Sequence, residues 1–272
     1  MMINAVVPSH APASPYRDAR AITADLAPDR IAEELVSLVA PASVAADQYR
    51  SLRYCIENVR AETGRRAFAV TSPSPGDGKT VTTLNLAGAL AQADGARVLV
   101  IDGDLRQPSV GRYLGLVDAR RGLVDALRDP SYALNGLARR ISQFNLWVVP
   151  AGRPEASPYE LLSSPRLEAI VAQARRDFDC VLIDTPPAVR MPDCRLIERW
   201  VDGVLLVVAA NKTPRALVSE ALNGLNPEKL FGFVFNADDR PSARYYGYYG
   251  HYGPSGSKPH SLPLWRRLFS SR

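Results

Sequence analysis

The 272-residue sequence predicts an α/β fold in which a mostly parallel β-sheet is flanked by helices. Short apolar runs alternate along the chain with stretches of helical periodicity. Runs that are apolar throughout are typical of parallel strands covered on both faces. The hydrophobic fraction of 46% is large enough for a sizeable core. We expect a folded domain over residues 31–240, a disordered segment at 1–30 and a flexible basic tail at 241–272.

Each element follows from a local pattern. The N-terminal segment is rich in Ala, Pro and Ser and has no periodicity. A short helix over 31–39 would stop before Pro41, and Ser43 would cap a helix over 45–61. Ser157-Pro158-Tyr159-Glu160 has capping-box spacing with Pro158 at the first helical position. The other expected helices are 81–93, 122–127, 165–176 and 214–224, and the expected strands are 67–71, 98–101, 146–149, 181–184, 204–208 and 231–235.

A glycine-containing loop, Ser74 to Thr80, joins the first strand to a helix. Gly76 and Gly78 allow backbone N–H groups to turn towards phosphate oxygens, and the helix N-terminus favours an anion. Lys79 can reach the outer phosphates and the Thr80 hydroxyl can bind magnesium. This is the context of a P-loop, although Pro73 stands where the consensus has glycine, and an ordinary turn is the alternative. The predicted ATP-binding residues are Gly76, Asp77, Gly78, Lys79, Thr80, Val81 and, at the end of the last strand, Asn236 facing the adenine.

Acidic residues follow two other strands. Asp102 and Asp104 come after the strand at 98–101, and their spacing places them on one side if that strand continues. Asp184 ends an apolar strand, which is the Walker B pattern. Because acids at the carboxyl edge of a sheet need a balancing cation, we expect Mg²⁺ beside ATP, with Thr80, Asp104 and Asp184 as the metal-site residues. The alternative for Asp102-Gly103-Asp104 is a simple turn.

Composition excludes several classes of function. All three histidines, His10, His251 and His260, lie in the expected tails, so the body has none for metal binding or general base catalysis. The three cysteines have no metal-site spacing, which favours a reduced, cytoplasmic chain. The longest apolar run, residues 204–210, is too short to span a membrane, and no signal peptide is expected.

The net charge of +5 belongs to the tail. Residues 241–272 contain five basic residues and no acid, so the other 28 basic residues balance 28 acidic ones. The tail also holds a tyrosine cluster interleaved with glycines: Tyr245, Tyr246, Tyr248, Tyr249 and Tyr252. A stacking platform for single-stranded nucleic acid is conceivable, but no nucleic acid is expected as a partner. Another alternative is a membrane-surface anchor formed by Leu264, Trp265, Leu268 and Phe269.

These motifs together resemble the bacterial tyrosine kinases (BY-kinases) of capsule and exopolysaccharide synthesis, in their free-standing cytoplasmic form. The resemblance covers about residues 35–252 and rests on the P-loop, the 98–104 run as a second Walker motif, and Walker B. Residues 157–164, residues 212–215 and the tyrosine cluster also match. It implies a P-loop NTPase of the deviant-Walker, partitioning-ATPase-like kind that phosphorylates the C-terminal tyrosines of neighbouring subunits with ATP.

The resemblance also implies roles for individual residues. Lys79, Asp102 and Asp104 would be catalytic: Lys79 would neutralise phosphates, Asp102 would accept or orient the tyrosyl hydroxyl, and Asp104 would assist. We expect Lys79 to face solvent when no nucleotide is bound. The family's subunit-contact motif, Glu-x-x-Arg-x-x-Arg, corresponds to Asp47, Arg50 and Arg53, in which the shorter acid makes ring assembly less certain.

Partners follow from the same resemblance. They are a separate membrane protein, a polysaccharide co-polymerase that activates the kinase and recruits it to the inner face of the membrane, further copies of this chain, and a cognate tyrosine phosphatase. The competing hypothesis is a partitioning-type switch ATPase, which hydrolyses ATP to position a partner without phosphorylating protein. Those ATPases typically carry a lysine where Ser74 stands and lack a tyrosine tail.

Overall fold

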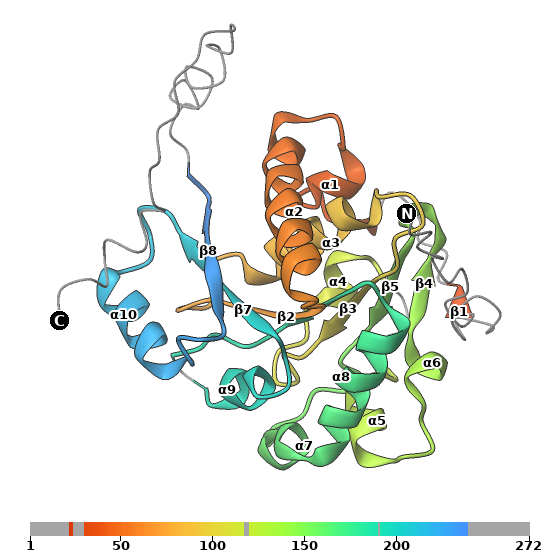
Figure 1. Cartoon of the computed structure of the whole chain (residues 1–272). Helices are drawn as coiled ribbons and strands as arrows, with labels where there is room; N and C mark the ends of the chain where they lie inside the picture. The colour runs from red at the N-terminus through yellow and green to blue at the C-terminus, as the bar shows by residue number, and fades with distance from the viewer. Residues whose placement is uncertain (1–21, 24–29, 117–119, 190, 239–272) are drawn as a thin grey trace, which may run out of the picture. The chain divides into compact units, whose positions relative to one another are not determined.

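The computed structural model describes residues 22–23, 30–116, 120–189 and 191–238. The predicted tyrosine tail and nearly all of the predicted disordered segment at 1–30 lie outside these residues. Within the described residues an eight-stranded sheet has the order β1-β4-β5-β3-β6-β2-β7-β8 (Figure 1). Its strands are β1 (Ile22–Thr23), β2 (Ala67–Thr71), β3 (Val98–Asp102), β4 (Arg139–Ile141), β5 (Leu146–Val149), β6 (Cys180–Asp184), β7 (Gly203–Ala209) and β8 (Leu230–Asn236).

The sheet is mostly parallel, as the apolar runs predict. Strands β5, β3, β6, β2, β7 and β8 are all parallel to their neighbours in that order. Strand β4 pairs antiparallel with β5, and β1 pairs parallel with β4. These two short strands were not expected, because segments of two or three residues carry no readable alternation.

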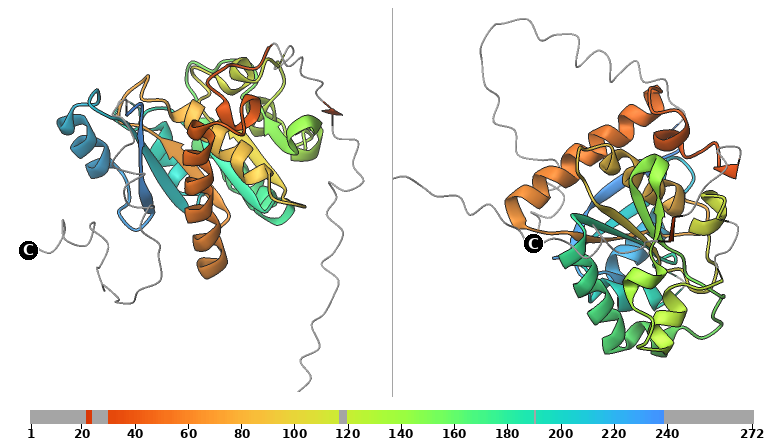
Figure 2. Two further views of the ribbon diagram at one scale, coloured as in Figure 1. Left: turned by 90° about the horizontal axis from the view of Figure 1, so that it is seen from above. Right: turned by 90° about the vertical axis from the view of Figure 1, so that its right-hand side faces the viewer.

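Helices cover both faces of the sheet (Figure 2). Residues of α1 to α4 share one buried apolar cluster with the sheet, and residues of α5 to α10 share a second cluster on the other face. The helices are α1 (Val36–Val39), α2 (Val44–Thr63), α3 (Lys79–Ala91), α4 (Val110–Tyr113), α5 (Leu123–Arg128), α6 (Leu134–Leu137), α7 (Tyr159–Ser163), α8 (Pro165–Asp177), α9 (Asp193–Glu198) and α10 (Arg215–Gly224), with a 3₁₀ turn, η2, at Ser142–Phe144.

The capping box expected at residue 157 is wrong. The N-cap of α7 is Pro158, in helical conformation and without a side-chain cap, so the helix begins at Tyr159. The backbone N–H of Ser157 instead donates to the Glu155 carboxylate, 3.1 Å away. The cap of α2 is as expected: the Ser43 hydroxyl accepts a bond from the backbone N–H of Ala46.

The three cysteines are free, and they lie in contrasting surroundings. Cys55 is exposed on α2, whereas Cys180 on β6 and Cys194 on α9 are buried. Burial raises the pKa of Cys180 to about 12 and also raises that of Cys194. No helix in the described ranges combines the length and the apolarity needed to cross a membrane.

Candidate active site

The loop of residues 72–78 follows the carboxyl end of β2 and leads directly into α3. Gly76 (φ 81°) and Gly78 (φ 93°) adopt left-handed backbone conformations that side chains disfavour. A Cβ atom added to Gly78 would lie 1.9 Å from Nδ2 of Asn236, so glycine is also required there for space. Val81, in the first turn of α3 directly after the loop, is partly buried and packs against the apolar core.

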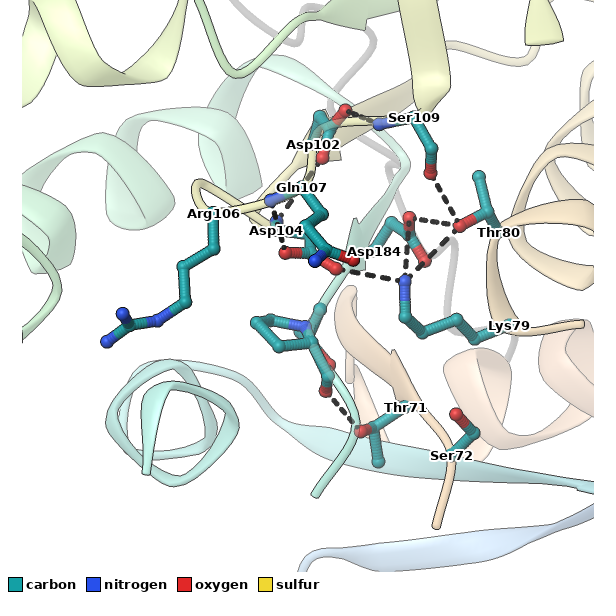
Figure 3. A network of polar contacts seen from close by, with 12 residues as sticks. Thr71, Ser72, Lys79, Thr80, Asp102, Asp104, Arg106, Gln107, Ser109 and Asp184 are labelled. Atoms are coloured by element: carbon teal, nitrogen blue, oxygen red, sulfur yellow. Dashed lines mark hydrogen bonds and ion pairs between the residues drawn. The ribbon is translucent and has the colours of Figure 1, made fainter. Parts of the chain in front are cut away.

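Lys79 points into a group of carboxylates, as Figure 3 shows. Its Nζ lies 3.2 Å from Oδ2 of Asp104 and 3.8 Å from Oδ2 of Asp184. The expectation that Lys79 faces solvent is wrong, since only 12% of its side chain is exposed. Burial alone would lower the pKa of Lys79, but the charges of Asp184 and Asp104 outweigh it and raise that pKa. The Lys79 side chain is therefore a cation that lies between the P-loop and the carboxylates of Asp104 and Asp184.

Asp184 connects the Walker B strand to the first turn of α3. Its Oδ2 accepts a hydrogen bond from Thr80 Oγ1 at 2.7 Å, and Oδ1 accepts one from Thr83 Oγ1 at 3.4 Å. Burial raises the pKa of Asp184, while Lys79 and the Thr80 hydroxyl act in the opposite direction. Thr80 also lies 2.9 Å from the hydroxyl of Ser109.

Asp102 is fully buried and holds the chain that follows β3. Its Oδ1 accepts a hydrogen bond from the backbone N–H of Asp104, and its Oδ2 accepts bonds from Ser109 and Val110. Burial, reinforced by the charge of Asp184, raises the pKa of Asp102 to about 8 despite those bonds. The carboxylate thus shapes the loop that presents Asp104.

Beyond this cluster, Arg106 braces the same loop against α9. Its guanidinium bonds the buried Asp193 carboxylate, with Nε 2.7 Å from Oδ2, and the backbone carbonyl of Ala156. Figure 3 shows Arg106 pointing away from Lys79.

The other side of the loop is built from the ends of β7 and β8. Oδ1 of the buried Asp77 accepts a hydrogen bond from Thr213 Oγ1 at 2.8 Å, and Oδ2 accepts one from the backbone N–H of Ser74 at 2.8 Å. Nδ2 of Asn236 donates to the backbone carbonyl of Asp77 at 3.0 Å. The Asp77 side chain therefore shapes the loop internally, and Asn236 packs against the loop itself.

The donor set fits a magnesium nucleotide. Two glycines free the backbone to surround phosphate, one lysine supplies positive charge, and the hydroxyl and carboxylate oxygens are ligands that Mg²⁺ prefers. In the part of the chain that the structure describes, no group of three or more His, Cys, Asp or Glu side chains could hold a metal by itself.

Sequence reasoning missed several residues of this site. Hydroxyl groups come from Thr83, Ser109 and Thr213. The Asp193 carboxylate accepts a hydrogen bond from the Arg106 guanidinium. Only Thr213 had a signal, as part of the 212–215 segment.

A cleft lies at the opposite edge of the sheet from the P-loop. This cleft of about 530 Å³, lined by residues such as Arg175, Trp200 and Lys229, sits at the amino ends of β2, β7 and β8. Arg175 pairs with Asp202, and Lys229 donates to backbone carbonyls, so these charges are already engaged.

The predicted subunit-contact residues lie on α2 and bond within this chain. Arg50 pairs with Asp47 and with the backbone carbonyl of Pro41. Arg53 pairs with Glu57 and donates to the Ala89 carbonyl of α3 at 3.0 Å.

Most of the chain is similar to known proteins. A family model described as an AAA domain matches residues 66–212. Tyrosine-protein kinase YwqD of Bacillus subtilis (strain 168) is 31% identical over 220 residues, which cover 80% of this chain and 92% of that one. The chain belongs to the bacterial tyrosine kinases. Its fold class and its enzyme class, protein-tyrosine kinase, are therefore those that the sequence predicts.

Two further similarities describe this kinase. The succinoglycan biosynthesis transport protein ExoP of Rhizobium meliloti (strain 1021) is 31% identical over 206 residues, which cover 74% of this chain but 26% of that protein. The kinase domain of Escherichia coli tyrosine kinase ETK superposes with a TM-score of 0.69 at 27% identity, covering 76% of this chain and 82% of that one. This kinase therefore has the fold of a P-loop nucleotide-binding enzyme, and one of its relatives, ExoP, is named as a succinoglycan biosynthesis transport protein.

Proposed function

We propose that this kinase transfers the γ-phosphoryl group of ATP, with Mg²⁺, to tyrosines in the C-terminal tails of neighbouring subunits. The observation that carries the proposal is the position of Lys79 between Asp104 and Asp184, beside the Thr80–Asp184 hydrogen bond. A P-loop lysine, a hydroxyl and a Walker B acid are the groups that phosphoryl transfer uses for positioning and charge neutralisation.

Binding would change the partners of Lys79. On nucleotide binding its ammonium exchanges carboxylate oxygens for oxygens of the β- and γ-phosphates. The Thr80 hydroxyl and the Asp184 carboxylate would hold Mg²⁺, Asp184 through water. The bound ion would neutralise charge on the transferred phosphoryl group. Asp104, released from Lys79, would be free to assist the metal or the acceptor, and Asn236 would face the adenine.

Asp102 and Asp104 would orient the tyrosyl hydroxyl. A tyrosine has a pKa of about 10, so an ordinary carboxylate is a weak base for it. The raised pKa of Asp102 narrows this gap, but Asp102 is fully buried and its oxygens accept backbone N–H bonds. We therefore assign the contact with the acceptor to Asp104, whose Oδ2 lies 3.2 Å from Lys79 Nζ. The mismatch is tolerable because the transition state is loose and the proton can leave late.

The proposal includes three partners: further copies of this chain, a membrane co-polymerase and a tyrosine phosphatase. Asp47, Arg50 and Arg53 of α2 would contact a neighbouring subunit after exchanging the bonds that they make within the chain. ExoP is named a transport protein for succinoglycan synthesis and is much longer than its matched region, which supports a membrane co-polymerase as activator of this chain. That protein would recruit the kinase to the inner face of the membrane, and a tyrosine phosphatase would reverse the modification.

The test is incubation with γ-labelled ATP, with and without cytoplasmic segments of candidate co-polymerases, followed by mapping of labelled residues. We expect label on the tail, and we expect most of it to be lost when Tyr245, Tyr246, Tyr248, Tyr249 and Tyr252 are all changed to Phe. Each phosphate adds about −1.5 to −2 charges, so about three would cancel the tail's charge of +5 and weaken the oligomer. Release of free phosphate without labelled protein would favour the partitioning-type ATPase instead.

A further inference from the structure

The loop after β7 is tightly folded and tied to its surroundings. Asn211 has a left-handed backbone conformation (φ 58°), and the backbone N–H groups of Lys212 and Thr213 donate to the Ala209 carbonyl. The N–H of Ala209 donates back to the Thr213 hydroxyl at 3.0 Å, and the N–H of Ala210 donates to the Asn236 carbonyl at 2.7 Å. The position of the Lys212 backbone is therefore fixed relative to the ends of β7 and β8.

Thr213 also joins this loop to the P-loop. Its hydroxyl accepts from Ala209, so its proton is available for the Asp77 carboxylate, to which it donates at 2.8 Å. Asp77 is 2% exposed, and its second oxygen accepts the Ser74 N–H. The Asp77–Thr213 bond thus couples the backbone that carries Lys212 to the backbone that would surround phosphate.

Lys212 lies over the phosphate-binding turn. Its Nζ is 3.9 Å from the place where a Cβ on Gly76 would lie. The side chain is exposed and, in contrast to Lys79, forms no ion pair with any residue that the structure describes. A cation without a carboxylate partner, whose backbone is held at the edge of an anion-binding loop, is available to an incoming anion.

We propose that Lys212 is a nucleotide-binding residue whose ammonium contacts phosphate oxygens of a nucleoside di- or triphosphate from the β7 side. This inference rests on the nucleotide site of the proposed function. Lys79 and the carboxylates occupy the β3 and β6 side of the P-loop, where the metal and the terminal phosphate belong. Lys212 is on the opposite side, towards β8, and it therefore binds the phosphates nearer the nucleoside. It contributes equally to ADP and ATP, and its contribution is independent of magnesium.

The experiment measures binding of a fluorescent ADP, mant-ADP, to the full chain with Mg²⁺ and again with EDTA. Lys212→Gln should raise the Kd about tenfold, because a charge-assisted hydrogen bond is lost. Lys212→Arg should recover most of the affinity. Arg215→Gln is the matched control, because Arg215 is exposed and close in sequence but begins α10, and it should leave the Kd unchanged.

A second pair of variants tests the coupling through Asp77. Thr213→Val removes the hydroxyl and should weaken mant-ADP binding in the same direction as Lys212→Gln, whereas Thr213→Ser should retain wild-type affinity. With Lys212 already changed to Gln, the further effect of Thr213→Val should be smaller, since the residue being positioned is gone.

Several results would overturn the inference. These are an unchanged Kd in Lys212→Gln, a loss that disappears in EDTA, and an equal loss in Arg215→Gln. Normal tyrosine phosphorylation together with unchanged ADP affinity in Lys212→Gln would reject the role of Lys212 and leave the kinase proposal intact. Conversely, a magnesium-independent loss of ADP affinity in a chain that labels no tyrosine would support Lys212 and reject the kinase proposal.

Discussion

The two sides of the P-loop satisfy their polar groups in different ways. On the β3 and β6 side, Asp104 and Asp184 both contact one lysine, and burial raises the pKa of the neighbouring Asp102 to about 8. On the β7 and β8 side, both carboxylate oxygens of Asp77 accept hydrogen bonds from neutral donors. The first side carries excess negative charge that a cation would relieve. On the second side the Asp77 carboxylate already has its hydrogen-bond donors, and the cation Lys212 has no ion pair among the residues that the structure describes. The first side therefore lacks positive charge, and the second side lacks an anion.

The largest effect that tests this comparison comes from Lys79→Met. Losing the charge at the phosphates should reduce tyrosine phosphorylation by about 10³-fold or more, measured with labelled ATP. The variant also removes the positive charge that counteracts burial of Asp184, so the pKa of Asp184 should rise further. When folding raises the pKa of a carboxyl group, the folded protein becomes less stable as the pH increases above about 4, which is the pKa of that group in the unfolded chain.

Denaturant unfolding at pH 5.5 and pH 8 measures this second effect. Lys79→Met should lose more stability than wild type between these two values. Lys212→Met is the matched control, because Lys212 is exposed and has no ion pair among the described residues, and it should behave like wild type. Wild-type labelling by a folded Lys79→Met protein would remove Lys79 from the mechanism.

Asp184→Asn should change activity and stability in opposite directions. Turnover at saturating Mg²⁺ and ATP should fall by about 10²–10³-fold, since one charge at the metal position is lost. Thermal stability without nucleotide should rise, because one of three crowded acids is neutralised while the new side chain can still accept from Thr80. Asp179→Asn provides the control, since Asp179 precedes the same strand but pairs with Arg97. Equal loss of turnover and stability in Asp184→Asn would mean that the acid is structural.

This contrast also explains what could be predicted from the sequence. Lys79, Thr80 and Asp184 stand beside long apolar runs, so the strand and helix patterns locate them at the carboxyl edge of the sheet. Thr213 and Ser109 reach the site through single hydroxyls from distant segments, and an isolated Ser or Thr has no distinguishing pattern. The low exposure of the Lys79 side chain could not be foreseen either. The carboxylates that contact it, Asp104 and Asp184, come from two other segments of the chain, at the ends of β3 and β6. Strand β4 was missed because its first two residues are arginines and it has only three.

The smallest expected effects come from the β8 side of the loop. Gly78→Ala should destabilise the fold by about 2 kcal/mol, since a left-handed residue acquires a side chain that also displaces Asn236. Asn236→Ala should cost about 1 kcal/mol through the lost bond to the Asp77 carbonyl. Chemical unfolding measures both changes.

Together these two changes should cost less than their sum, because the collision with Asn236 is absent in the double variant. Gly136→Ala is the control, since nothing lies within 4 Å of its added Cβ atom. Strict additivity of Gly78→Ala and Asn236→Ala would show that the two residues do not pack against each other in solution.

The unequal surroundings of the three thiols have a practical consequence. Maleimide dyes react with thiolates, and the buried Cys180 and Cys194 both have raised pKa values. Cys55 is exposed and lies two positions after Arg53 on α2. The natural chain therefore accepts one fluorophore at one defined place, without engineering. Energy transfer between donor- and acceptor-labelled copies would then report in real time whether this helix face meets its counterpart, and whether ATP separates the two.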